Sequence, residues 1–165
     1  MDLDLKDKVV LVTGSGQGIG RTIALALAAE GALVAVNDVN VKGIEETVDA
    51  VRRSGHKAIA APCDITSLDA VKEMVNKVQA ELGRVDVLVN NAALLICHEM
   101  FLDTNPEDCD KEIRVILYGT MNCVRAVLQA SPASCPLLPL PPPWALLRAT
   151  LRGRRGKSAA IRDRR

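Results

Sequence analysis

Eight residues near the N-terminus carry the clearest chemical pattern in the sequence. Four glycines occur in Thr13–Gly20, the segment TGSGQGIG, between a short β-branched run and a stretch rich in Ala and Leu. Glycines allow a tight turn and close approach of a ligand to the backbone, while the N-terminus of a following helix attracts an anion such as pyrophosphate. The spacing of Gly14, Gly18 and Gly20 fits T-G-x-x-x-G-x-G rather than G-x-G-x-x-G. The segment therefore predicts a dinucleotide-binding turn.

An acidic residue follows at the distance that such a site requires. Asp38 lies at the end of the second predicted strand, eighteen positions after Gly20. A carboxylate there accepts hydrogen bonds from the ribose hydroxyls of an adenosine. It would repel a 2′-phosphate, and neither Ser15 nor Gln17 offers a cation to offset this repulsion, so the sequence favours NAD over NADP. The alternative is that Asp38 only caps the next helix or begins a turn.

The elements that must position these residues alternate between strand and helix. Short apolar runs are typical of strands buried on both faces of a parallel sheet, and joints that are also short favour right-handed crossovers. We therefore expect a Rossmann-like, doubly wound α/β fold that is incomplete, with about four strands. The predicted strands are Lys8–Thr13, Ala32–Val36, Ala58–Ala61 and Val85–Val89, and the predicted helices are Ile19–Glu30, Val41–Arg53, a helix capped by Ser67 that ends at Leu82, and Pro106–Leu128.

The character of the sequence changes after Gln129. Six of the eight prolines lie in residues 132–143, where they exclude a central strand. Residues 144–165 hold eight Lys or Arg against one acid, while the remainder of the chain carries 13 bases and 19 acids. We expect an NAD-binding domain at residues 1–130 and a Pro-rich, then Arg-rich, disordered tail at residues 131–165.

Over residues 5–130 the chain resembles a classical short-chain dehydrogenase/reductase. The resemblance rests on TGSGQGIG, on Asp38, on Cys63-Asp64-Ile65 and on Asn90-Asn91-Ala92-Ala93 after the fourth predicted strand. It implies that Asp64 contacts the adenine amino group, that the backbone of Ile65 binds the edge of the ring, and that Asn90 stabilises the central sheet. The cofactor-binding residues that it implies are Gly14, Ser15, Gln17, Gly18, Ile19, Gly20, Asp38, Asp64, Ile65, Asn91, Ala92 and Ala93.

The expected catalytic residues do not match. The family uses a Tyr followed four residues later by a Lys, with a Ser upstream, and the Lys lowers the pKa of the Tyr so that it can exchange a proton with the substrate. The one tyrosine here is Tyr118, and Asn122 lies four residues after it. We expect Tyr118 to pack on a helix face. Ile116 occupies the position of a family Asn, and Ala93 replaces a family Gly. We therefore expect no catalytic residue in this chain and no turnover.

Two functions remain open. In the first, the chain is a truncated or frame-shifted member of an NAD-dependent alcohol dehydrogenase or ketone reductase lineage. In the second, it is a non-catalytic nucleotide-binding or partner-binding module whose basic tail attracts polyanions. Three aromatic residues in 165 provide few stacking platforms, so we expect no specific nucleic-acid site.

The remaining patterns point to a soluble, metal-free protein. The five cysteines form no C-x-x-C pair, which favours free thiols and predicts no metal site. The start MDLDLKDK is too acidic for a signal peptide, and no apolar run could span a bilayer, so we expect a cytoplasmic protein. Members of the family usually form homo-oligomers through their fourth and fifth helices. The sequence leaves the substrate and the oligomeric state open.

Overall fold

The computed structural model describes residues 3–96 and 100–130. The predicted disorder of residues 131–165 lies outside the described residues. Every predicted strand and helix is present, with bounds that differ by a few residues. The strands are β1 Val9–Val12, β2 Leu33–Val36, β3 Ala58–Ala60 and β4 Val87–Val89. The helices are α1 Gly18–Ala29, α2 Val41–Arg53, α3 Leu68–Leu82, the short 3₁₀ helix η1 Phe101–Asp103, α4 Pro106–Ile113, the π-helix η2 Arg114–Gly119 and α5 Thr120–Ala130.

The four strands form one parallel sheet in the order β3-β2-β1-β4. Val12, the last residue of β1, lies opposite both Val36 of β2 and Val89 of β4. The carboxyl ends of three strands therefore meet at one edge of the sheet, where ligands bind in open α/β folds. The expected Rossmann-like, doubly wound fold is confirmed.

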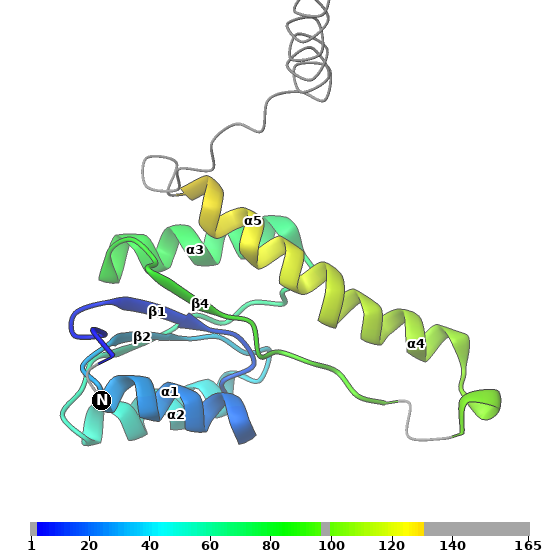
Figure 1. Ribbon diagram of the computed structural model, residues 1–165, viewed down its shortest axis with the longest axis horizontal. Helices are drawn as coiled ribbons and strands as arrows, with labels where there is room; N and C mark the ends of the chain where they lie inside the picture. Colours follow the sequence, from blue (N-terminus) through cyan, green and yellow to red (C-terminus); the bar gives the residue numbers. More distant parts are fainter. Residues whose placement is uncertain (1–2, 97–99, 131–165) are drawn as a thin grey trace, which may run out of the picture. The chain divides into compact units, whose positions relative to one another are not determined.

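Both faces of the sheet are covered by helices (Figure 1). On β1, Val10 and Val12 belong to one apolar cluster and Val9 and Leu11 to another, as the two-residue period of a strand requires. Helices α1 and α2 complete the first cluster, and helices α3 and α5 complete the second. Burial on both faces explains why β1 is a continuous apolar run rather than an alternating one.

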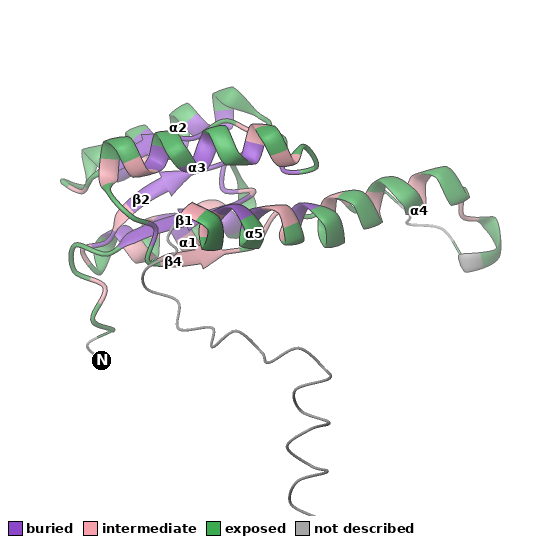
Figure 2. Ribbon diagram, turned by 90° about the horizontal axis from the view of Figure 1, so that it is seen from above, coloured by how far each residue is buried: buried purple, intermediate pink, exposed green. Residues whose placement is uncertain are grey.

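Strand β4 lies at the edge of the sheet. Among the described residues it pairs with β1 alone. Its three residues are each half-buried, whereas all four residues of β1 are buried (Figure 2). The backbone of such an edge is a template for pairing with another chain.

The last predicted helix is interrupted, which corrects the prediction of one continuous helix over Pro106–Leu128. A π-helix, Arg114–Gly119, separates α4 from α5. A π-helical turn holds one residue more than an α-helical turn, and the sequence analysis treated the whole segment as one regular helix. Helix α4 has no buried residue and extends past the end of the sheet in both views (Figures 1 and 2). Within the described residues, no helix has the length and apolar character that a membrane span needs.

The carboxylate of Asp86 joins β4 to β1 at the start of both strands. Its Oδ2 accepts a hydrogen bond from the backbone N–H of Val9 at 3.0 Å, and the N–H of Asp86 donates to the Val9 carbonyl at 2.9 Å. The bond from Val9, aided by the nearby Arg84, lowers the pKa of Asp86 although partial burial acts in the opposite direction. The Asp86 carboxylate thereby adds a hydrogen bond between β1 and β4, and β1 is the one strand that β4 pairs with in the described structure.

We predict that Asp86→Asn lowers the free energy of unfolding by about 1 kcal/mol at neutral pH, because the bond from Val9 loses its charged acceptor. Since the pKa is lower in the folded state, the stabilisation is present above the unfolded value of about 4 and disappears as the pH falls through the folded value. Urea unfolding from pH 7 to pH 3 measures this. A difference between wild type and variant that grows toward acid pH would contradict the prediction.

Candidate functional site

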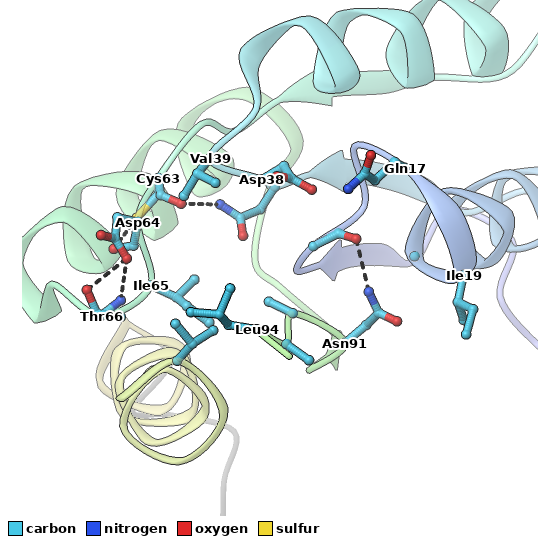
Figure 3. A pocket seen from close by; sticks show the side chains of 16 residues that line it. Gln17, Ile19, Asp38, Val39, Cys63, Asp64, Ile65, Thr66, Asn91 and Leu94 are labelled. Atoms are coloured by element: carbon cyan, nitrogen blue, oxygen red, sulfur yellow. Dashed lines mark hydrogen bonds between the residues drawn. The ribbon is translucent and has the colours of Figure 1, made fainter. Parts of the chain in front are cut away.

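A cavity of about 540 Å³ opens at the carboxyl ends of the strands. Five segments surround it: the glycine-rich turn after β1, the end of β2, the β3–α3 connection, the segment after β4 and η2, which contributes Val115 (Figure 3). The described residues that line it are Gly14, Gln17, Ile19, Gly20, Asn37, Asp38, Val39, Cys63, Asp64, Ile65, Thr66, Asn91, Ala92, Ala93, Leu94 and Val115. Ten of the twelve predicted cofactor-binding residues are in this set, and Ser15 and Gly18 are not.

The glycine-rich turn packs against its neighbours too closely for side chains. Gly14 has φ of 62°, and a Cβ there would lie 2.7 Å from the Cα of Ala92. A Cβ on Gly20 would lie 2.2 Å from the carbonyl oxygen of Gly14. At Gly18, by contrast, a Cβ would meet nothing within 4 Å. Helix α1 begins at this residue, and the side chain of Gln17 makes no capping hydrogen bond. The turn therefore offers an accessible helix N-terminus that fits a phosphate group.

Ser15 stabilises the turn from inside. Its side chain is buried, and the hydroxyl lies 2.7 Å from the carbonyl oxygen of Val12, to which it donates. The Ser15 backbone N–H donates to the Asn37 carbonyl at 2.8 Å. Ser15 is not among the residues that line the cavity, and its hydroxyl is used within the turn.

Asp38 lines the cavity and also organises two backbone segments. Its Oδ2 accepts from the N–H of Gly16 at 2.9 Å, and its Oδ1 accepts from the N–H of Asn40 at 3.0 Å. Asp38 thus begins a turn, which was the alternative interpretation, while the side chain that caps α2 belongs to Asn40. Both bonds use backbone N–H donors and hold the carboxylate beside the glycine-rich turn.

Asn91 ties the end of β4 to the turn. Its amide nitrogen lies 3.0 Å from the carbonyl oxygens of both Thr13 and Gly14. The N–H groups of Asn91 and Ala92 donate to the Thr13 hydroxyl at 3.0 and 3.1 Å. The sequence predicted Asn91 as a cofactor contact; the structure gives its amide group a role in holding the turn. Ala93 is not among the residues with positive φ, so the change from the family's Gly carries no backbone strain.

Asn37 lines the cavity and was not among the residues that the sequence analysis predicted there. It is 1% exposed, and its amide nitrogen donates to the carbonyls of Ala61 at 2.9 Å and Cys63 at 3.1 Å. These bonds hold the β3–α3 connection against the end of β2. The signal in the sequence was a polar side chain directly after the buried run LVAV and directly before Asp38.

The β3–α3 connection supplies a second carboxylate. Asp64 is exposed, and its Oδ1 accepts from the N–H of Thr66 at 2.9 Å and from the Thr66 hydroxyl at 2.8 Å (Figure 3). Ile65 is 5% exposed and joins the apolar cluster beneath. Burial and the neighbouring Asp64 raise the pKa of the Cys63 thiol to about 11, which favours the protonated thiol at neutral pH.

Comparison with known proteins agrees with this geometry. Residues 8–133 match the model of a family described as short chain dehydrogenase. The chain belongs to the short-chain dehydrogenase family.

Two solved structures and one curated relative illustrate the likeness. A short chain dehydrogenase from Mycobacterium avium superimposes with a TM-score of 0.72 at 34% identity, over 76% of this chain and 46% of that one. A gluconate 5-dehydrogenase from Burkholderia cenocepacia, in complex with NADP and tartrate, gives 0.71 at 32% identity, over 76% and 49%. The (2S)-[(R)-hydroxy(phenyl)methyl]succinyl-CoA dehydrogenase subunit BbsD of Thauera aromatica is 36% identical over 76% of this chain and 50% of its own length. The chain spans about half the length of these relatives.

Two residues of η2 that the sequence analysis considered lie at the surface of the described structure. Ile116 and Tyr118 are 43% and 55% exposed, and neither lines the cavity. The prediction that Tyr118 packs on a helix face is therefore wrong for the part of the chain that the structure describes. Asn122, four residues later, donates to the backbone of the β3–α3 connection rather than facing Tyr118. Among the described residues, no group of three or more potential ligands is arranged to hold a metal ion.

We predict that Gly14→Ala and Gly55→Ala differ sharply in their effect on stability. Both glycines have positive φ, 62° and 83°, so both substitutions incur a backbone strain of about 1–2 kcal/mol. A Cβ at Gly55 meets nothing within 4 Å, whereas at Gly14 it meets the backbone of Ala92. Chemical unfolding should show about 1 kcal/mol lost for Gly55→Ala and about 3 kcal/mol or more for Gly14→Ala. Equal losses would show that the turn can move away from β4.

Proposed function

We propose that this chain binds a nicotinamide dinucleotide in the cavity at the ends of the strands, as the cofactor-binding part of an alcohol or ketone oxidoreductase. One observation carries the proposal. The glycine-rich turn, with an open helix N-terminus, and the carboxylates of Asp38 and Asp64 line the same cavity. A pyrophosphate fits the first feature, and the ribose and adenine of an adenosine fit the other two.

The same cavity supports a preference for NAD over NADP. The Asp38 carboxylate would lie beside a 2′-phosphate, and the described residues that line the cavity include no Lys or Arg. The guanidinium of Arg21 pairs with Glu46 at 3.5 Å instead. The gluconate 5-dehydrogenase that the fold resembles binds NADP, so likeness to the family alone does not decide between the two cofactors.

We further propose that the 165 residues bind the cofactor without turning over a substrate. Hydride transfer from an alcohol needs a base for the hydroxyl proton. The single tyrosine of the sequence is outside the cavity, and the residue four positions later is Asn122 rather than a Lys. What the geometry supports is therefore binding and orientation of a dinucleotide.

We predict that NAD binds with a Kd about tenfold or more below that of NADP, a difference of about 1.4 kcal/mol. The neutral variant Asp38→Asn should have more similar Kd values for NAD and NADP. The repulsion of the 2′-phosphate is removed, while one side-chain oxygen acceptor remains. Calorimetric titration of both nucleotides into both proteins measures this, with an unfolding curve of the variant as the control for folding. Equal or reversed affinities in the wild type would remove Asp38 from its proposed role.

We predict no formation of NADH when the purified chain is incubated with NAD and a panel of secondary alcohols. Absorbance of NADH follows the reaction, and an active short-chain dehydrogenase is the positive control. NADH production that depends on the protein and that Asp38→Arg abolishes would refute the proposal, because it would require a proton acceptor other than the expected Tyr and Lys pair.

A further inference from the structure

Helix α5 contacts the back of the β3–α3 connection at a point that neither the sequence pattern nor the cavity lining identifies. The Asn122 amide nitrogen donates to the carbonyl of Ile65 at 3.0 Å and to the carbonyl of Thr66 at 3.2 Å. Because backbone carbonyls can only accept, the amide nitrogen must face them, and the direction of these bonds is determined. Asn122 is therefore placed to hold the two residues that follow Asp64.

These bonds continue to the carboxylate. The peptide group between Ile65 and Thr66 is held at both ends: its carbonyl accepts from Asn122, and its N–H donates to Oδ1 of Asp64 at 2.9 Å. The Thr66 hydroxyl donates to the same Oδ1 at 2.8 Å. A change in the orientation of this peptide would therefore move the Asp64 carboxylate, which lines the cavity.

The packing beneath the connection leaves little freedom for another arrangement. Gly119, in the last position of η2, is buried, and a Cβ there would lie 2.5 Å from Cδ1 of Ile65. Asn37 holds the first half of the same connection, at Ala61 and Cys63, while Asn122 holds the second half. Together the two amides hold the connection from β2 on one side and from α5 on the other.

We propose that Asn122 is a positioning residue for the adenosine end of the dinucleotide. It does not line the cavity; it acts by holding the Ile65–Thr66 peptide so that Asp64 and the Ile65 backbone present their polar groups to the adenine. This inference rests on the proposed function, since it assigns a role within the same site. A residue that merely stabilised the fold would alter the unfolding midpoint without altering nucleotide affinity at temperatures where the protein is folded.

The test uses Asn122→Asp, which keeps the shape but replaces the donating nitrogen by an acceptor facing two carbonyls. Asn105→Asp is the matched control, because the side chain of Asn105 caps α4 by accepting from the N–H of Glu107 and an aspartate can do the same. The full chain is titrated with 5′-AMP, and hydrogen exchange of the peptide that spans residues 64–67 is measured without nucleotide. We expect Asn122→Asp to weaken 5′-AMP binding by tenfold or more and to speed exchange in this peptide, and Asn105→Asp to change neither.

The outcomes separate this inference from the proposed function. Unchanged 5′-AMP affinity in a folded Asn122→Asp protein would overturn the role of Asn122 and leave the proposed function intact. Failure of the wild type to bind 5′-AMP or NAD would overturn the proposed function itself, and with it the role of Asn122 in nucleotide binding. If Asn122→Asp does not fold, Asn122→Ala, which removes the donor without adding a charge, is tested in the same way: wild-type affinity overturns the inference, and a tenfold loss supports it.

Discussion

The parallel pairing of β1 with β4 determines how the glycine-rich turn meets the segment after β4 at the candidate site. The register that places Val12 opposite Val89 brings the residues after both strands together, so that Gly14 lies against the backbone of Ala92. The Thr13 hydroxyl receives two N–H donors from the segment after β4. If the register moved by one residue, these contacts would be lost and the faces of β4 would exchange.

Consequently the glycines near the cavity serve the protein's own packing as much as a ligand. Gly14 and Gly20 are crowded by the protein itself, and only Gly18 is open around its missing Cβ. Because glycines form this part of the cavity wall, no bulky side chain covers the N-terminus of α1. Two of the three motif glycines are therefore needed for packing within the protein: Gly14 against the segment after β4, and Gly20 against the turn itself.

The sequence predicted the fold, and ten of the twelve residues that it assigned to a cofactor line one cavity, because both depend on local patterns. Continuous apolar runs indicate the buried strands. The glycine-rich turn, Asp38 and Asp64 were then identified because each follows one of these strands. The sequence analysis did not predict the π-helix at Arg114–Gly119. It also missed Asn37 and Asn122, because an amide that bonds to backbone carbonyls gains its role from tertiary contacts that have no fixed spacing. Ser15 was assigned by motif position, and the fold turns its hydroxyl inward.

Three asparagines, Asn37, Asn91 and Asn122, each donate from one amide nitrogen to two backbone carbonyls around the cavity. Neutral amides keep their hydrogen-bonding character across the physiological pH range, so these bonds do not depend on proton concentration. Asparagine is, however, chemically labile at high temperature. Deamidation of any of the three would place a carboxylate against two carbonyl oxygens and convert two attractions into repulsions. The cavity would then lose hydrogen bonds through slow deamidation, while the apolar sheet beneath it kept its packing.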